Sequence, residues 1–313
     1  MNKINKEIQI LLVVIFFSLL VYGGVETYAH KVMHKHVDSK NYEYTDLPAI
    51  TKTGDPVAGA ALVTGAAACT GCHGIKSQDM PAPMDAATAV ASYGVTPPDL
   101  STAGILYESN FLAALIKDPV ATLKLEHKFD DTKMHPMTAF SGAGGDLDQE
   151  VADIVAYFKS IAPQEITPKQ AYEDACSRCH EMRYMKATQL GDTPTFKFEK
   201  DALAYRVKVL EYQDTLKGYM GKLPPDLSTI IVARSNSFLT TFIEDPQSHL
   251  KGTSMPRVGL TADATDKVMT HLTHSGDPAK EIRNSLGWKV ILFFIIFSVL
   301  AYLWKQSVWS KLH

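Results

Sequence analysis

Hydrophobic side chains are concentrated at the two ends of the chain. Residues Ile8 to Val25 form a run of 18 residues without a charge, and Leu286 to Trp304 contain one charged residue, Lys289. As a helix, at about 1.5 Å per residue, the first run is roughly 27 Å long, close to the thickness of the hydrocarbon core of a bilayer. Neither run has a polar face, which argues against a buried amphipathic helix. Both runs therefore predict membrane-spanning helices.

The N-terminal run also resembles an export signal, because Lys3 and Lys6 give it a positive start. The apolar part of such a signal is usually about 7–15 residues long, and the cleavage-like site at Thr27-Tyr28-Ala29 is poor. We therefore expect a retained anchor. Lys305 and Lys311 follow the second run. The positive-inside rule then predicts two spans in a bacterial inner membrane, with both termini cytoplasmic and the residues between them periplasmic.

The stretch between the two ends has the composition of a globular protein. It contains 26 basic and 33 acidic side chains, a net charge of −7, and the whole chain is 46% hydrophobic and 21% charged. These values exclude a disordered polymer and a strongly basic nucleic-acid-binding protein.

This stretch contains an internal repeat. Residues 97–119 and 224–246 align without a gap, with 11 of 23 positions identical. Each copy follows a Cys-x-x-Cys-His motif and precedes a loop that contains methionine. The shared order predicts two domains of one family. The expected organisation is an N-terminal start and span (1–29), a linker (30–49), the first domain (50–162), the second domain (163–275), a linker (276–285), and a C-terminal span and end (286–313).

The patterns in both domains predict a mainly α fold. Asp55-Pro56 and Thr167-Pro168 are typical starts of helices that lead into the two motifs. Phe111 to Ile116 and Phe238 to Ile243 predict short helices that end at Asp-Pro. The first domain closes with a helix whose buried stripe is Val151, Ile154, Val155 and Phe158, and residues 262–274 are its less regular counterpart.

Cys-x-x-Cys-His is the sequence to which haem c is attached. Cys69 and Cys72 are three residues apart, so on a helical turn both reach one edge of a porphyrin, and His73 follows as an iron ligand. Cys176, Cys179 and His180 repeat the arrangement. Small domains of short helices bury little apolar surface, and a macrocycle completes such a core. We therefore expect two covalently bound haem c groups, each with one iron.

Other uses of two cysteine pairs fit the sequence less well. A zinc ribbon places its pairs about 15–20 residues apart, whereas 104 positions separate Cys72 from Cys176. A thioredoxin-like motif needs a βαβ setting, which the patterns do not predict. Disulfide bonds would leave the histidine after each pair unexplained.

The sixth iron ligand is expected in the loop before each closing helix. In the second domain this is Met255 in the segment TSMPRVG. The first domain offers Met134 and Met137 in MHPMTAF, and the spacing from Met137 to Phe140 matches that from Met255 to Val258, which favours Met137. His127, His135 and His249 remain alternatives. A thioether ligand would raise the reduction potential above that of an iron with two histidines.

The second domain resembles cytochrome c1. The resemblance rests on CSRCHEMRYM at 176–185, LPPDLSTIIVAR at 223–234 and the Met255-Pro256 loop, followed by one apolar helix. It covers residues 163–313 well, whereas residues 50–162 resemble class I cytochromes c in general. The resemblance implies two tandem class I cytochrome c-like domains between two transmembrane helices. It also implies roles in the haem environment: the carbonyls of Pro98 and Pro225 hold the iron-bound histidines, Leu100 and Leu227 pack on the macrocycles, and Arg234 lies near a propionate.

A second haem domain and an N-terminal span distinguish this chain from mitochondrial-type cytochrome c1. The layout resembles the di-haem subunits of quinol–cytochrome c reductases (cytochrome bc complexes) of ε-proteobacteria and actinobacteria. That resemblance implies a membrane-anchored electron-transfer subunit of a dimeric complex, beside a cytochrome b subunit. Electrons would pass from a Rieske iron–sulfur protein through the second and then the first haem to a terminal oxidase or a soluble cytochrome c. Such a subunit is not catalytic alone.

Two alternative functions share the haem motifs. The di-haem subunit of a cbb3-type oxidase is normally anchored at its N-terminus and does not end in a span, unlike this chain with its run at Leu286–Trp304. A di-haem peroxidase needs one iron with an exchangeable site, whereas each domain here offers a methionine for the sixth position.

Overall fold

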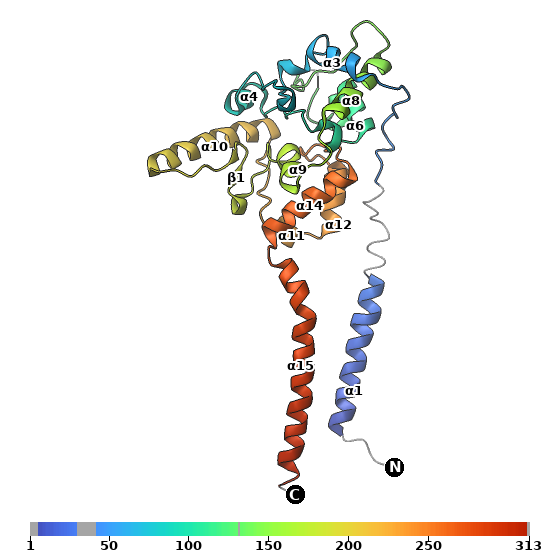
Figure 1. The fold of residues 1–313 in the computed structure, drawn as a ribbon, viewed down its shortest axis with the longest axis vertical. Helices are drawn as coiled ribbons and strands as arrows, with labels where there is room; N and C mark the ends of the chain where they lie inside the picture. The colour runs from blue at the N-terminus through green and yellow to red at the C-terminus, as the bar shows by residue number, and fades with distance from the viewer. Residues whose placement is uncertain (1–5, 30–41, 131, 312–313) are drawn as a thin grey trace.

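The computed structural model describes residues 6–29, 42–130 and 132–311, and it is mainly α-helical. A body of short helices stands at one end of two long apolar helices (Figure 1). Of the linker predicted over 30–49, residues 30–41 lie outside the described residues.

The two long helices correspond to the two apolar runs. The first comprises α1 (Lys6–Leu19) and a π-helical turn, η1 (Leu20–Val25), and the second is α15 (Lys280–Trp309). By length and composition both are able to cross a membrane. They extend from the same side of the body, and the start of α1 and the end of α15 lie at the same far end (Figure 1). There Lys305 Nζ lies 3.5 Å from Glu7 Oε2, so an ion pair joins the two helices.

The first domain consists of short helices, several of which begin where the sequence predicts. The side chain of Asp55 caps α3 by accepting a hydrogen bond from Val57 N, and Asp118 ends α6 and caps α7. The closing helix α8 buries the predicted stripe of Val151, Ile154, Val155 and Phe158. The elements are α3 (Pro56–Thr64), η3 (Cys69–Gly71), η4 (Lys76–Gln78), α4 (Ala86–Tyr93), α5 (Ala103–Leu106), α6 (Ser109–Lys117), α7 (Pro119–Thr122) and α8 (Leu147–Ile161).

The helices α3 and α8 pack closely against each other. Gly59 makes this possible, because a Cβ atom there would lie 2.0 Å from the carbonyl oxygen of Asp153. Asp153 Oδ1 in turn accepts a hydrogen bond of 2.7 Å from Asp55 N at the start of α3. The closing helix thus fixes the helix that leads into the first Cys-x-x-Cys-His motif.

The second domain repeats this order. Thr167 caps α9, and the closing helix α14 packs on α9 as α8 packs on α3. Asp245 ends α12 in the same way as Asp118 ends α6. The elements are α9 (Pro168–Ala175), η5 (Arg183–Met185), the hairpin β1 (Ala187–Thr188) and β2 (Gly191–Asp192), α10 (Glu199–Met220), α11 (Ile230–Ala233), α12 (Asn236–Glu244), α13 (Pro246–His249) and α14 (Ala262–Gly276).

The hairpin and α10 form an insertion that the sequence patterns do not predict. His73 and Pro97 are 24 positions apart, whereas His180 and Pro224 are 44 apart. The C-terminal half of α10 packs on α4 of the first domain, and the rest of the helix projects from the body (Figure 1). Tyr212 on this helix lies 3.0 Å from Thr96 Oγ1, hydroxyl to hydroxyl. The insertion therefore links the second domain to the first.

One apolar core continues through both domains. It contains Leu106 and Phe158 of the first domain together with Tyr172, Leu260 and Leu272 of the second. A separate small cluster joins Val90 of α4 to Tyr212, Leu216 and Met220 of α10. The two domains are therefore packed as one body.

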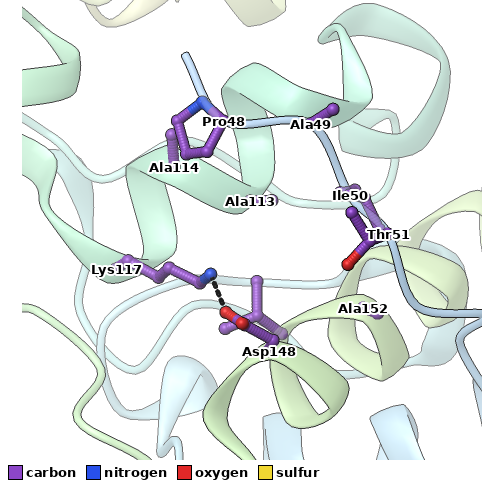
Figure 2. Close-up of a pocket in the computed structure, with 10 residues that line it drawn as sticks. Pro48, Ala49, Ile50, Thr51, Ala113, Ala114, Lys117, Asp148 and Ala152 are labelled. Atoms are coloured by element: carbon purple, nitrogen blue, oxygen red, sulfur yellow. Dashed lines mark hydrogen bonds and ion pairs between the residues drawn. The ribbon is translucent and has the colours of Figure 1, made fainter.

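A small pocket lies where the segment before α3 crosses α6 and α8 (Figure 2). Its volume is about 180 Å³, and residues 48–51 form one wall. An ion pair between Lys117 and Asp148 closes another side. Cysteine and histidine are absent from its lining, so this pocket is separate from the two Cys-x-x-Cys-His motifs.

Candidate haem-binding sites

Each Cys-x-x-Cys-His motif forms a tight turn; the second begins directly after α9, and the first begins five residues after the end of α3. His73 N donates a hydrogen bond of 2.9 Å to Cys69 O, and His180 N donates one of 2.9 Å to Cys176 O. The histidine is thus brought back beside the first cysteine of its own motif. None of the four cysteines forms a disulfide bond. Burial raises the pKa of Cys69 to about 11 and that of Cys176 to about 12, so both thiols are uncharged at neutral pH.

The two histidines are held in the same way. Nδ1 of His73 lies 2.8 Å from the carbonyl oxygen of Pro98, and Nδ1 of His180 lies 2.8 Å from that of Pro225. Because a carbonyl only accepts hydrogen bonds, Nδ1 carries the proton and Nε2 has the free lone pair. Burial lowers the pKa of both imidazoles, which favours their neutral form. A neutral imidazole with a free Nε2 is a metal ligand whose orientation is fixed.

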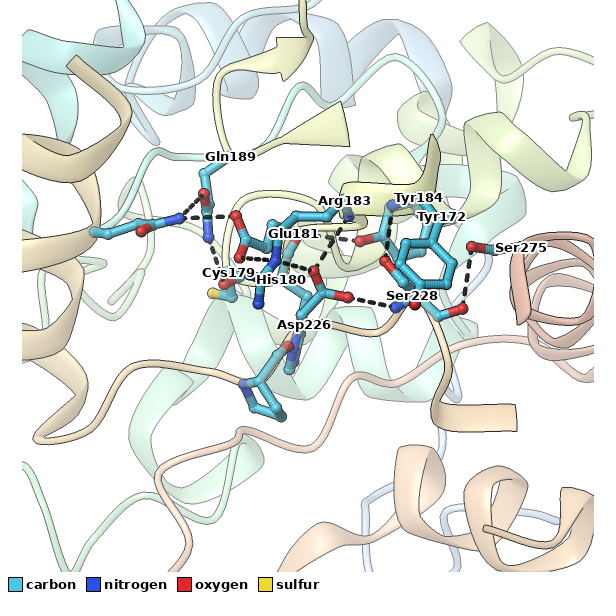
Figure 3. Close-up of polar contacts among 12 residues, drawn as sticks. Tyr172, Cys179, His180, Glu181, Arg183, Tyr184, Gln189, Asp226, Ser228 and Ser275 are labelled. Carbon is cyan, nitrogen blue, oxygen red and sulfur yellow. Dashed lines mark hydrogen bonds and ion pairs between the residues drawn. The ribbon is translucent and has the colours of Figure 1, made fainter. Parts of the chain in front are cut away.

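The segment that supplies these carbonyls is bonded to the residues after each motif. In the second domain Asp226 Oδ2 accepts a hydrogen bond of 3.2 Å from Arg183 N, and Ser228 Oγ accepts one of 3.1 Å from Tyr184 N. Leu227 N donates to Glu181 O at 3.0 Å. Figure 3 shows this group of contacts beside His180.

The first domain contains the same set of hydrogen bonds. Asp99 Oδ2 accepts from Lys76 N at 3.4 Å, and Ser101 Oγ accepts from Ser77 N at 3.0 Å. Leu100 N donates to Gly74 O at 2.8 Å. This aspartate and this serine were not among the site residues predicted from the sequence. Their identity in both copies of Pro-Pro-Asp-Leu-Ser was the signal that pointed to one.

The second site has an additional polar network around its motif (Figure 3). Tyr172 donates to His180 O at 2.9 Å, and its ring stacks on His271 with 5.0 Å between the centroids. Gln189 Nε2 donates to Cys179 O at 3.3 Å, and Gln213 Nε2 donates to Glu181 Oε2 at 3.0 Å. The backbone of the motif is therefore fixed on both sides of His180.

The candidate methionines differ in exposure. Met137 and Met255 are half-buried, whereas the side chain of Met134 is 77% exposed. Gln247 Nε2 donates to Met255 O at 2.8 Å, which holds the second loop. In the first loop, Nδ1 of His135 lies 3.1 Å from Met137 O.

The alternative histidines and the other expected residues are placed as follows. His127 and His249 are exposed, and the ring of His249 packs against Phe238 and Phe242. Leu100 is buried and Leu227 is half-buried. Arg234 is exposed, with its guanidinium 5.8 Å from the centroid of the Phe238 ring.

The two sites are electrostatically close to each other. Arg178, between the two cysteines of the second motif, contributes with its positive charge to lowering the pKa of His73 and of His135, after the larger effect of burial. The hydroxyl of Tyr212 donates to Arg178 O at 2.9 Å and contacts Thr96 of the first domain. The second motif thus lies beside the first domain's candidate site.

The residues at both sites fit a covalently bound haem c. Each site has two cysteines three residues apart, a neutral imidazole with a free Nε2, and a half-buried methionine in the loop before the closing helix. This donor set matches thioether attachment with axial ligation by histidine and methionine.

Comparisons with known families match two parts of the chain. Residues 56–162 match the model of the cytochrome c family, and residues 258–312 match that of the cytochrome C1 family. The first range contains Cys69, Cys72, His73 and Met137; the motif at 176–180 lies outside both ranges. The first domain is therefore a cytochrome c domain, and such domains carry covalently bound haem c.

A search of solved structures found similarity to a chain described as "Hyperthermophilic respiratory Complex III". The two are 21% identical, the match covers 47% of this chain and 75% of that one, and the TM-score is 0.38. A similarity this low does not support a functional argument. No curated protein matched the chain.

Proposed function

We propose that the chain is a membrane-anchored electron-transfer subunit with two covalently bound haem c groups. The observation that carries this proposal is the repeated set of hydrogen bonds at the two motifs. His180 and His73 each contact a proline carbonyl through Nδ1. After each histidine, two backbone N–H groups donate to an aspartate and a serine at equivalent positions of the two motifs. Because the first domain is a cytochrome c domain, the repetition of its contacts supports a second haem at Cys176 and Cys179.

The proposed complex is a quinol–cytochrome c reductase. The match of residues 258–312 to the cytochrome C1 family supports this assignment, as do the c1-like segments at 176–185 and 223–234. The partners are then a cytochrome b subunit, which oxidises quinol, and a Rieske iron–sulfur protein. Electrons leave to a terminal oxidase or a soluble cytochrome c.

The proposed topology places α1 and α15 across a bacterial inner membrane. Both helices are long and apolar enough, and the ion pair between Glu7 and Lys305 joins their far ends. Lys3, Lys6, Lys305 and Lys311 favour a cytoplasmic location for those ends. The two haem domains then lie in the periplasm, where haem c proteins receive their cofactor.

In this function haem iron, when bound, supplies the one-electron redox chemistry. The chain's own residues perform the remaining tasks. The thiols at 69, 72, 176 and 179 bind the macrocycles, and the carbonyls of Pro98 and Pro225 keep the proton on Nδ1 of each histidine. Leu100 and the rest of the shared core exclude water from the sites.

The number of haems is tested by measuring covalently bound haem per chain, spectroscopically after denaturation and by mass. Two per chain are expected in the wild type, and one in each of the double variants Cys69→Ala/Cys72→Ala and Cys176→Ala/Cys179→Ala. A single haem in the wild type would refute the second site. Purification of the native membrane complex should recover a cytochrome b subunit and a Rieske protein, and their absence would refute the proposed complex.

The direction of electron transfer is tested with the same double variants. Loss of the second haem should stop oxidation of the Rieske centre, whereas loss of the first should leave the second haem reducible. If oxidation of the Rieske centre continues at full speed without the second haem, the order is wrong. Rapid turnover of peroxide by the reduced protein would instead support the peroxidase alternative.

A further inference from the structure

The loop that contains Met255 is bonded to the first domain as well as to its own. Glu108 N donates to Gly259 O at 2.8 Å, and Thr261 N donates to Leu106 O at 3.0 Å. Leu260 and Tyr107 form an antiparallel bridge between these bonds. Two segments more than a hundred residues apart are therefore paired along their backbones.

The corresponding loop of the first domain behaves differently. Phe140 N, three residues after Met137, donates at 2.9 Å to Ile116 O on α6 of the same domain. In the second loop the equivalent residue is Val258, and its neighbours Arg257 and Gly259 are bonded to the first domain instead. Gly259 has φ +75°, and a Cβ atom there would lie 2.0 Å from Phe111 Cδ1. The loop therefore has no room to move toward the first domain.

Arg257, two residues after Met255, is the centre of this attachment. Its side chain is 1% exposed, although it belongs to a surface loop of the second domain. Nε and Nη2 donate to Thr122 O at 3.1 and 3.0 Å, and Nη1 donates to both carboxylate oxygens of Asp46 at 2.9 and 2.8 Å. Every one of these partners precedes or belongs to the first domain.

The guanidinium is also enclosed by aromatic rings. It lies 5.3 Å from the centroid of Tyr44 and 6.0 Å from that of Phe111. Burying a charge is costly unless it is paired and hydrogen-bonded, and here the bidentate carboxylate and the carbonyl meet that requirement. Burial raises the pKa of Asp46, but the hydrogen bonds and charge of Arg257 outweigh this effect and lower it, so the Asp46 carboxylate is ionised at neutral pH.

The end of α7 serves as a common support for the loop. Leu123 O accepts hydrogen bonds from Arg257 N at 3.3 Å and from Gln247 Nε2 at 3.4 Å. The same amide group of Gln247 donates to Met255 O at 2.8 Å. Arg257 N is thus bonded directly to Leu123 of the first domain, and Met255 O is linked to the same residue through Gln247.

We propose that Arg257 is a positioning residue that holds Met255 in place as the sixth ligand of the second haem iron. The first domain and the segment at 44–46 then hold in place the loop of the second domain that carries Met255. This inference rests on the proposed function, in which Met255 is an iron ligand. Arg257 acts through the backbone of Pro256, the one residue between it and Met255.

The test uses the full-length protein with Met137→Leu as the background, so that any sulfur-to-iron charge-transfer absorption of the ferric protein comes from the second haem. In this background Arg257→Gln is expected to remove that absorption and to let the ferrous second haem bind carbon monoxide, while two haems per chain remain attached. The matched control is Lys124→Gln, which cuts another bond between the domains, the 2.8 Å ion pair to Asp245, and leaves the side-chain contacts of Arg257 intact. It should keep the absorption.

Two further variants make the outcomes distinguishable. Met255→Leu should remove the absorption; if it does not, both the ligand assignment and the role of Arg257 are wrong. If Met255→Leu removes it but Arg257→Gln retains it and binds no carbon monoxide, only the present inference is wrong. Asp46→Asn removes the half-exposed charge partner and leaves Arg257 in place. Should Arg257→Gln fail to fold, Asp46→Asn must lose the absorption on heating at a lower temperature than Lys124→Gln, and equal temperatures would overturn the inference.

Discussion

The carbonyl oxygen of Pro225 accepts a hydrogen bond from Nδ1 of His180 at 2.8 Å, across 45 residues of sequence. The contact fixes which ring nitrogen is free and in which direction it points. Pro98 and His73 form the same pair in the first domain. Because such an acceptor strengthens electron donation by the imidazole, it stabilises the ferric state of a bound haem.

Replacing Pro225 with alanine frees the backbone at the acceptor and should weaken this hydrogen bond. The reduction potential of the second haem is then expected to rise by tens of mV, since a tenfold change in a one-electron equilibrium corresponds to about 59 mV. A spectroscopic redox titration measures the shift. Pro98→Ala is the matched control and should move the potential of the first haem instead. Equal shifts of both haems in either variant would contradict the prediction.

Asp226 should stabilise the second site through its hydrogen bonds to backbone N–H groups. Its carboxylate accepts from Ser228 N at 2.7 Å and from Arg183 Nε at 2.8 Å. Asp226→Ala is expected to lower the free energy of unfolding by about 2 kcal/mol, because hydrogen bonds to a charged group contribute about 1.5–3 kcal/mol each and the site is partly solvated. Denaturant titration measures the loss, and Asp226→Asn, which keeps one acceptor oxygen, should lose less.

The contribution of Asp226 should also depend on pH. Burial raises its pKa, but hydrogen bonds from Ser228 and Arg183 outweigh that effect and hold the pKa below the usual value of 3.8. The stabilisation is therefore present above the unfolded-state pKa and is lost as the pH falls through the folded-state pKa. A difference between wild type and Asp226→Ala that did not shrink in acid would contradict this explanation.

Glu244 should make the protein less stable as the pH rises from about 4.5 to about 7. Its side chain is 5% exposed, and Oε2 has no hydrogen-bond partner within the described part of the chain. Burial raises its pKa from 4.5 to about 7. The folded state therefore holds a proton that the unfolded state releases from about pH 4.5 upward, and stability falls until the carboxyl ionises near pH 7.

Glu244→Gln removes this titration. We expect the free energy of unfolding of the wild type to fall by roughly 2–3 kcal/mol relative to the variant between pH 4.5 and 7.5. Denaturant midpoints measured across that range test the prediction. Glu199→Gln, at the exposed start of α10, serves as the control and should follow the wild type. Parallel curves for wild type and Glu244→Gln would show that the carboxyl is not buried as described.

Met137 and Met134 differ in their exposure to solvent, which favours Met137 as the sixth ligand of the first haem iron. A sixth ligand must be enclosed beside the macrocycle, and Met134 is 77% exposed whereas Met137 is half-buried. In a Met255→Leu background, Met137→Leu should abolish the remaining sulfur-to-iron absorption of the ferric protein, and Met134→Leu should leave it unchanged. Loss of the absorption in Met134→Leu but not in Met137→Leu would make Met134 the ligand. If both variants keep the absorption, neither methionine is the ligand and His135 becomes the candidate.

The helices were predictable where one face of a segment is buried. Val151, Ile154, Val155 and Phe158 point to one side of α8, and their spacing alone revealed it. Helix α10 was not predicted, because its apolar residues lie on two opposite faces. Val209, Tyr212 and Leu216 are buried, while Leu203, Val207 and Leu210 are exposed, so the sequence shows no single stripe.

The local parts of the site were predictable for a similar reason. Each motif and each Pro-Pro-Asp-Leu-Ser segment is an unbroken stretch of sequence. Because both occur twice, each copy can be recognised by alignment with the other. The attachment of the second loop was not predictable. Arg257 finds its partners 135 and 211 residues away, and no local pattern marks such a contact.

The continuous core beneath the two domains has a consequence for how electrons cross between them. Leu106 and Phe158 pack in the same cluster as Tyr172 and Leu272, so neither domain is able to swing away without exposing apolar surface to water. The separation of the two proposed haems is then set once, when the chain folds, and stays constant from one turnover to the next. Transfer between them would be a fixed-distance, intramolecular event whose rate is independent of protein concentration and of solvent viscosity.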